Sequence, residues 1–191
     1  MLNPVATSMS YQLKVTLRES DPPIWRRIIV PSDLTLEELH AVLQISMGWE
    51  NDHMHAFIAG KIQYGERGML DGAKDECKAR LNDVFAKVGS RIVYEYDFGD
   101  NWVHDVVLED KLPADDKQQI VCLDGQRSCP PEDCGGVWGY ENLLEALSDK
   151  KHPEHKQLRE WLGGPFNPER FDAKAVTKRL KRVSSAQCLG L

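Results

Sequence analysis

Hydrophobic and polar residues alternate along residues 11–17, and this period of two predicts a half-buried β-strand. One face of the strand carries Tyr11, Leu13, Val15 and Leu17. Asp21-Pro22-Pro23 interrupts the alternation, and residues 24–30 predict a second strand. The chain is therefore expected to open with a β-hairpin that has a longer connection.

The pattern then changes to a helical period, which predicts an amphipathic helix that ends at Gly48. Thr35 is the expected N-cap, and Glu38 stands where it completes a capping box. The apolar stripe of this helix is formed by Leu36, Leu39, Leu43 and Met47.

Two further antiparallel hairpins are predicted beyond the helix. The first pairs residues 53–58 with 62–64, and the second pairs residues 91–98 with 102–109 across Gly99-Asp100-Asn101. Residues 65–80 are rich in glycine and charge and are expected to form a mobile loop. Residues 81–88 predict a short helix, and residues 119–123 predict a last strand.

The C-terminal third is predicted to be helical, over residues 140–148, 153–162 and 172–183. The element order predicts an α+β fold with a β-grasp-like start (hairpin, capped helix, further antiparallel hairpins) and a helical C-terminal cover. One domain is expected over residues 11–183, with a flexible N-terminus at 1–10 and a flexible tail at 184–191.

Composition and charge narrow the class of protein. The hydrophobic fraction of 41% is ordinary for a globular chain, and no apolar run approaches the roughly 20 residues that cross a bilayer. Met1 to Ser10 lacks the pattern of a signal peptide, so a cytoplasmic protein without a membrane partner is expected. The net charge of −6 is uneven, because residues 150–191 hold ten Lys or Arg and only four Asp or Glu.

The negative charge of residues 1–149 argues against nucleic acid as a partner. The basic face of residues 172–183 is the one segment that could attract phosphates, through Lys174, Lys178, Arg179, Lys181 and Arg182. No aromatic stacking platform accompanies these side chains. We therefore expect no specific DNA or RNA binding at physiological salt, and weak contact at low salt.

Five cysteines, an odd number without a C-x-x-C pair, indicate reduced thiols rather than a disulfide framework. Cys122, Cys129 and Cys134 lie close enough in sequence to be considered as zinc ligands. Cys134 follows Glu132 and Asp133, and this acidic setting is expected to raise the pKa of its thiol.

Three histidines are the candidate metal ligands. On the predicted strand, the rings of His53 and His55 project from one face, and His104 lies on another predicted strand. If those strands are neighbours, the three rings converge with Asp97, Asp100 or Glu132 available as a carboxylate. Histidines beside aromatic residues are usually hydrogen-bonded groups of the core or its rim, and that interpretation is the favoured one.

Two loops have the composition of shaped, ligand-binding segments: Gly99–Asn101, and Pro130–Gly136 with its prolines and glycines. The binding candidates in and beside these loops are Asp97, Asp100, Trp102, Glu132, Asp133 and Cys134.

Several motifs together resemble the Ri-plasmid Orf3-like family, also known as TnpR-like passenger proteins of insertion elements. They are residues 22–27 (PPIWRR), 53–57 (HMHAF), 94–104 (YEYDFGDNWVH), 130–140 (PPEDCGGVWGY) and 166–172 (FNPERFD). The resemblance implies one α+β domain in a prokaryotic, mobile-element setting, and it supplies no mechanism. A resolvase nucleophile and a helix-turn-helix are not found in the sequence.

Two hypotheses of function follow. The preferred one is a non-enzymatic binding or accessory module that recognises a protein or a small ligand through the two loops. The alternative is a metal-dependent hydrolase with zinc or a similar divalent ion on His53, His55 and His104, and Asp100 or Glu132 as general base.

Overall fold

Eight strands form one sheet in the computed structural model, which describes residues 9–114 and 119–187. The order across the sheet is β5-β4-β3-β6-β7-β1-β2-β8. Neighbouring strands are antiparallel except β4 and β5. The strands are β1 (Met9–Leu17), β2 (Trp25–Pro31), β3 (His55–Ala59), β4 (Ile62–Gly65), β5 (Lys74–Asp75), β6 (Arg91–Tyr96), β7 (Trp102–Pro113) and β8 (Val121–Gln126).

The predicted opening hairpin and capped helix are confirmed. In β1 the side chains predicted to face inward are buried, and β1 pairs with β2 along its length. Helix α1 (Leu36–Met47) begins at Thr35, whose side chain accepts from the Glu38 amide while the Glu38 carboxylate accepts from the Thr35 amide. Gly48 ends the helix in the left-handed conformation. The α+β class and the order of hairpin, helix and further hairpins are as predicted.

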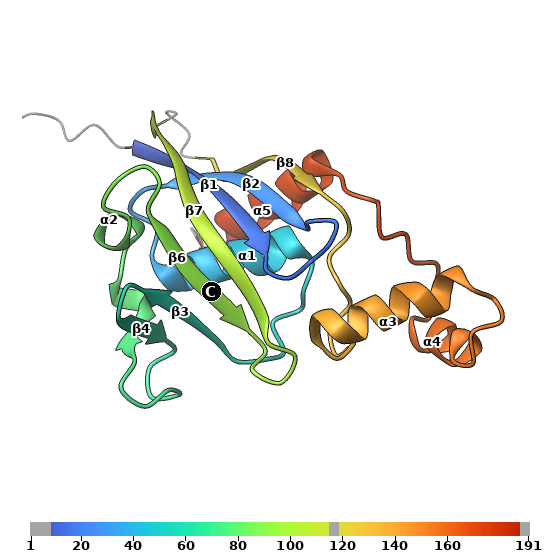
Figure 1. Ribbon diagram of the computed structural model, residues 1–191. Coiled ribbons are helices and arrows are strands. Elements are labelled where there is room, and N and C mark those ends of the chain that lie inside the picture. Colours follow the sequence, from blue (N-terminus) through green and yellow to red (C-terminus); the bar gives the residue numbers. More distant parts are fainter. Residues whose placement is uncertain (1–8, 115–118, 188–191) are drawn as a thin grey trace, which may run out of the picture.

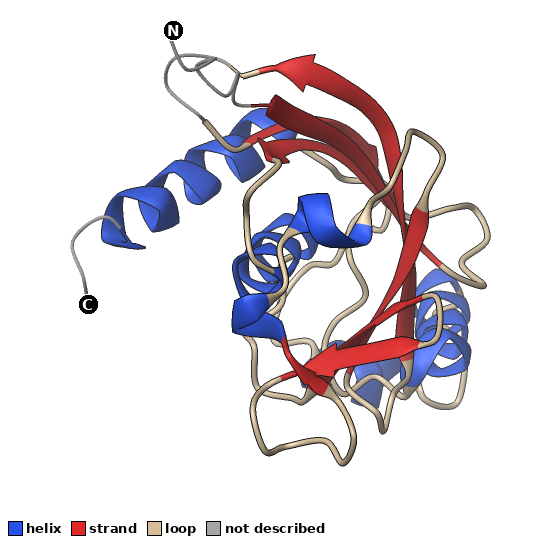
Figure 2. Cartoon of the chain, turned by 90° about the vertical axis from the view of Figure 1, so that its left-hand side faces the viewer, coloured by secondary structure: helices blue, strands red, loops and turns tan. Residues whose placement is uncertain are grey.

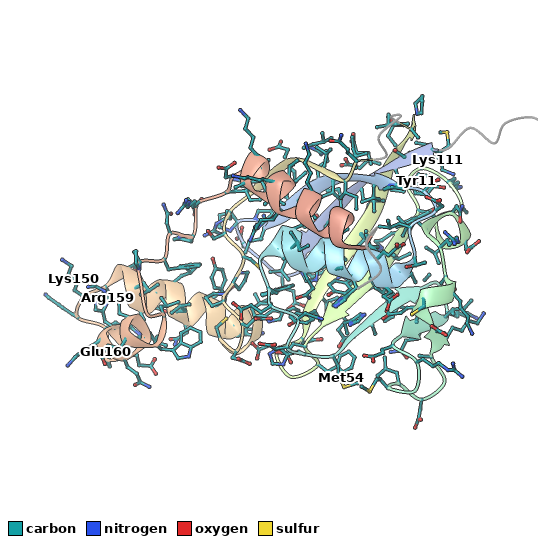
Figure 3. The ribbon with its side chains drawn as sticks, turned by 180° about the vertical axis from the view of Figure 1, so that it is seen from behind. Tyr11, Met54, Lys111, Lys150, Arg159 and Glu160 are labelled. Carbon is teal, nitrogen blue, oxygen red and sulfur yellow. The ribbon has the colours of Figure 1, made fainter. Side chains whose placement is uncertain are left out.

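Helices α1 and α5 (Ala173–Gln187) cover the same face of the sheet, which is strongly twisted and curved (Figures 2 and 3). Val176 and Leu180 of α5 are buried against the core. The core is formed by the inward side chains of the strands and the apolar stripe of α1. None of the helices in the described part of the chain is long and apolar enough to cross a membrane.

Helices α3 (Gly136–Ser148) and α4 (His155–Trp161) pack against one another and project beyond the sheet instead of covering it (Figure 1). Lys150, Arg159 and Glu160 lie at the far end of this helix pair (Figure 3). The predicted helical cover is thus supplied by α5, while α3 and α4 form a lateral extension.

Several boundaries differ from the prediction. Strand β3 begins at His55, so His53 lies in the preceding loop and not on the strand. Residues 65–80 contain β5 and the 3-10 helix η1 (Glu76–Lys78), and the predicted helix at 81–88 is shortened to α2 (Leu81–Val84). Strand β1 begins at Met9, two residues before the predicted strand, and α5 runs to Gln187, past the predicted helix end at residue 183.

Candidate functional site

Three connecting segments meet at one end of the sheet: residues 49–54, which join α1 to β3, the turn 97–101 between β6 and β7, and residues 130–136 before α3. We call this place the loop junction. The amide of Asp97 donates to the Met54 carbonyl at 2.9 Å, and the Trp49 indole donates to the Pro130 carbonyl at 3.1 Å. The two loops singled out from the sequence are therefore adjacent in space.

Asp100 attaches the turn to the third segment. Its Oδ2 accepts from the Gly135 amide at 3.1 Å. Its carbonyl oxygen lies 2.4 Å from the position that a Cβ on Gly136 would occupy, so only glycine fits there. Asp100, a candidate general base from the sequence, thus positions the 130–136 segment in this structure.

Four residues of the junction other than glycine have left-handed backbone conformations. They are Asn51, Asp97, Asn101 and Asp133, with φ between 55° and 66°. Asn and Asp tolerate this region best among residues with a side chain, which explains the composition of these loops. Asp97 uses Oδ1 to accept from the Gly99 amide at 2.9 Å, which leaves Oδ2 directed toward His53.

His53 lies between two carboxylates. Its Nδ1 is 3.7 Å from Asp97 Oδ2, and its Nε2 is 3.2 Å from Asp133 Oδ1. One ligand atom from each of the three residues lies within 4.8 Å of the others, a spacing that could hold a metal ion. An imidazole with two carboxylates suits a divalent transition metal such as zinc.

A second group of carboxylates adjoins the first, because its members are sequence neighbours of His53 and Asp133. It consists of Glu50, Asp52 and Glu132, again within 4.8 Å. Tyr96 organises it, since its buried hydroxyl donates to Glu132 Oε1 and accepts from the Asp52 amide. Burial and the hydrogen bond to Glu132 raise the pKa of Tyr96 well above its usual range.

The charge of the loop junction is not compensated by the protein. Within the described chain, no Lys or Arg nitrogen lies within 4.0 Å of its six carboxylates, which are Glu50, Asp52, Asp97, Asp100, Glu132 and Asp133. Among the described residues, His53 is the one Lys, Arg or His side chain with a ring or side-chain nitrogen within 4.0 Å of any of them. Like charges held this close repel, so the junction favours a bound cation.

His55 belongs to a different cluster, beside the junction. Its ring stacks on that of His40 at a centroid distance of 3.5 Å, and its Nε2 lies 2.9 Å from Oε2 of the buried Glu76. His40 is satisfied as a neutral ring: Nε2–H donates to Asn51 Oδ1 at 2.6 Å and Nδ1 accepts from the Tyr94 hydroxyl at 2.8 Å. Burial, followed by the charge of His55, lowers the pKa of His40 to about 4.

A cavity of about 650 Å³ connects this cluster with His53. Its described lining contains no Lys, Arg, Ser, Thr or Cys. The ionisable lining residues are Glu37, His40, Asp52, His53, His55, Glu66 and Glu76. The cavity therefore suits a cationic ligand and offers no side-chain hydroxyl or thiol as a nucleophile.

His104 and Trp102 lie in the core. Both are fully buried, and neither His104 Nε2 nor Trp102 Nε1 has a hydrogen-bond partner in the described part of the chain. His104 Nδ1 is 3.4 Å from the Tyr94 carbonyl oxygen, and burial lowers the pKa of the ring to about 4. The ring of Trp49 covers both side chains.

The structure does not bring His53, His55 and His104 together. Strand β6 lies between β3 and β7, so His55 and His104 are two strand spacings apart, about 10 Å. The Tyr94 ring lies between these two histidine rings. His53 is not on the strand, because β3 begins at His55. No group of described residues whose ligand atoms could share one ion contains all three rings.

The cysteines form no such group either among the described residues. Burial, then the charges of Asp100 and Asp133, raises the pKa of Cys134 to about 12. The predicted direction is confirmed, although burial is the larger cause. Burial also raises the pKa of Cys122 to about 11, so these thiols are protonated at neutral pH.

Sequence reasoning missed His40, Glu76 and Tyr96. His40 had a detectable signal, because it stands four residues after Leu36, on the inward side of an otherwise apolar helical stripe. Glu76 had no such signal in the sequence, since it lies in a glycine- and charge-rich segment whose composition predicts an open loop.

Comparisons with known proteins place this architecture in a family. The model of the plasmid pRiA4b ORF-3-like protein family matches residues 9–175. A relative from Sinorhizobium fredii, "Uncharacterized protein y4hQ", is 38% identical over 155 residues, which are 80% of each chain. The crystal structure of a protein of unknown function, MM3350 from Methanosarcina mazei Go1, superposes with a TM-score of 0.82 at 40% identity, over 89% of this chain and 98% of that one. The resemblance drawn from the motifs is thereby confirmed: this chain belongs to the plasmid pRiA4b ORF-3-like family.

Proposed function

We propose that this chain is a binding module rather than an enzyme, and that its recognition surface is the loop junction, where it binds a divalent cation such as zinc. One observation carries the proposal: five carboxylates from three segments form, with His53, two groups whose possible ligand atoms lie within 4.8 Å of one another, without a Lys or Arg partner in the described chain. A divalent cation on His53, Asp97 and Asp133 would neutralise part of that charge and link the segments.

The experiment is elemental analysis of protein purified without chelator, followed by titration of the metal-free protein with zinc. We expect about one equivalent of a divalent metal, because the group of His53, Asp97 and Asp133 offers one imidazole and two carboxylates. His53→Ala should abolish the stoichiometric binding. His152→Ala, in the turn between α3 and α4, is the matched control and should leave it intact. Less than a tenth of an equivalent in the unmodified protein, with no zinc uptake, would refute the cation site.

A metal-dependent hydrolase is the second candidate, favoured by the pairing of His55 with the buried Glu76 in the cavity that His53 also lines. There a metal on His53 would supply a hydroxide nucleophile, and His55, oriented by Glu76, would transfer protons. This ligand set differs from the His53, His55 and His104 set expected from the sequence.

Hydrolysis of p-nitrophenyl acetate and p-nitrophenyl phosphate by zinc-loaded protein distinguishes the two functions. Metal binding without turnover supports the binding module. Turnover that is lost in both His53→Ala and His55→Gln supports the hydrolase.

The cellular location and the genetic context of the protein are also open to a proposal. We propose that the ligand or protein partner is met in the cytoplasm and that the module accompanies a mobile element without itself binding nucleic acid. The support is the acidic charge of residues 1–149 and the name of the family, which refers to a plasmid reading frame.

A further inference from the structure

A second cavity, of about 580 Å³, is bordered by Trp49 and Glu50, the residues just before those of the same segment that line the histidine cavity. Its wall is formed by β2, the end of α1, the segment 128–132, residues 166–172 and α5. The side chains that define its chemistry are Arg26, Ser46, Arg170 and Arg179, with Trp49, Phe166 and Phe171 as aromatic surface.

Arg26 is a buried positive charge without a carboxylate. It lies at an inward position of β2 and is 1% exposed. Its Nε donates to the Ser46 carbonyl at 2.9 Å, and its Nη1 donates to the Trp25 and Gln126 carbonyls at 2.8 and 2.9 Å. These acceptors are neutral, so the charge remains, and Nη2 has no protein acceptor in the described chain. A buried charge of this kind is costly unless an anion accompanies it.

The cavity holds a second unsatisfied buried group. Ser46 is 1% exposed, and its Oγ has no hydrogen-bond partner among the described residues. Arg26 and Ser46 are linked through the Ser46 carbonyl, and both residues line the cavity. A guanidinium fork beside a hydroxyl is a donor set for the oxygens of a carboxylate or a phosphate.

Two further arginines at the rim add to the positive potential. Arg170 and Arg179 form no ion pair in the described chain, and the charge of Arg179 is close enough to lower the pKa of Arg26, although burial is the larger cause. The rim also carries Glu50, Glu132 and Asp172. Asp172 accepts from the Ala175 amide at the start of α5, and Glu132 accepts from Tyr96 and Glu50, so these two carboxylates are engaged elsewhere.

The ring of Phe171 gives the cavity an organic surface. It lies 4.2 Å from the Arg26 guanidinium carbon and packs where a Cβ on Gly125 would stand. A volume of 580 Å³ is far larger than an inorganic anion needs and falls within the range of pockets for small organic ligands.

We propose that this cavity binds a small organic anion, whose carboxylate or phosphate group contacts Arg26 and Ser46 and whose apolar body lies against Trp49 and Phe166. The proposal does not rest on the cation site at the loop junction, because Arg26 and Ser46 are not part of that site, although Glu50 and Glu132 belong to the junction and also border this cavity.

The test is isothermal titration of the full chain with benzoate, phenyl phosphate and the neutral benzamide. We expect one of the anions to bind at least about tenfold more tightly than benzamide, because a charged acceptor would satisfy Arg26 and Ser46. The stronger anion identifies the ligand as a carboxylate or a phosphate ester. Equal binding of benzamide, or no binding of either anion at millimolar concentration, would overturn the proposal.

Variants localise the site. The double change Arg170→Gln and Arg179→Gln should weaken anion binding about tenfold, and Ser46→Ala about fivefold. Lys178→Gln, an exposed neighbour on α5 outside the cavity wall, is the matched control and should change nothing. Arg26 is kept intact, because its three carbonyl contacts join β2, α1 and β8. If Lys178→Gln weakens binding as much as the double variant, the attraction is a general property of α5 and the site is refuted.

Discussion

His40 and His104 are buried imidazoles whose pKa values are both lowered to about 4, His40 by burial and the charge of His55, His104 by burial. A histidine in the unfolded chain has a pKa near 6.5. Between this pH and about 4, these two side chains bind protons in the unfolded chain but stay neutral in the native protein. Their contribution to the free energy of unfolding is complete above about pH 6.5 and is lost as the pH falls toward 4.

We therefore expect the free energy of unfolding to fall steeply between pH 6.5 and 4, by up to about 1.4 kcal/mol per pH unit for each ring. His104→Leu removes one titrating ring and should give a shallower slope, which urea titrations at a series of pH values would measure. An unchanged slope in this variant would contradict the assignment of a neutral buried His104.

Arg26 is a charged residue at an inward position of an alternating strand. The period of two in residues 24–30 places this position inward, beside Ile24 and Ile28, where a charge is rarely found. The conflict between residue type and position is visible in the sequence, but the acceptors that surround the guanidinium come from β2, α1 and β8 and are not.

At the scale of the element, α1 owes its first turn to the reciprocal contact of Thr35 and Glu38. Thr35→Ala should lower the free energy of unfolding by about 1 kcal/mol, because one amide of the first turn loses its acceptor. Glu38→Gln keeps an oxygen acceptor and should cost less. Urea denaturation of the two variants tests this order, and an equal or reversed order would argue against the capping box.

The loop junction depends on Gly136, where a Cβ would lie 2.4 Å from the Asp100 carbonyl oxygen and where φ is +70°. Gly136→Ala should therefore push the 130–136 segment away from the turn and destabilise the protein by about 1–3 kcal/mol.

Gly164→Ala is the control, since a Cβ on Gly164 would meet no heavy atom within 4 Å and the residue has no positive φ. Melting temperatures give the stability of each variant, and the zinc titration gives the state of the junction. If Gly136→Ala matched Gly164→Ala in both measurements, the close approach to Asp100 would not be a constraint.

At the scale of the whole molecule, the C-terminal segment differs in charge from the rest of the chain. Residues 150–191 carry an excess of Lys and Arg, whereas residues 1–149 carry an excess of Asp and Glu. If about four of the basic side chains of the C-terminal helix contacted phosphates, log affinity would fall with log salt at a slope near −3.6. We expect no specific binding of duplex or single-stranded oligonucleotides at physiological salt and weak contact at low salt. Submicromolar binding at physiological salt that collapses in Lys178→Glu would overturn this expectation.

Elements were predictable from the sequence to the extent that local patterns determine them. The capping box and the alternation of β1 are local patterns, and both were confirmed. The convergence of side chains was not predictable, because it depends on the order of strands. Inserting β6 between β3 and β7 separates His55 from His104, and strand β3 begins only at His55, so His53 is not part of it.

The site was predictable in part for the same reason. Asp97, Asp133 and Glu132 stand in or beside two loops whose composition marks them in the sequence, and the fold brings those loops together around His53. The cavity beside Arg26 is lined by five separate parts of the chain, and no spacing along the sequence predicts that these parts lie together.

The segment Trp49–His53 has a consequence for how ligands would influence one another. Trp49 and Glu50 border the arginine cavity, while Asp52 and His53 border the histidine cavity, and the Glu50 amide bonds to Glu132 at 3.2 Å. A ligand that repositions these five residues therefore alters the wall of the other cavity. Thermodynamic linkage then requires the effect to be reciprocal: whatever factor zinc imposes on the affinity for the anion, the anion imposes on the affinity for zinc.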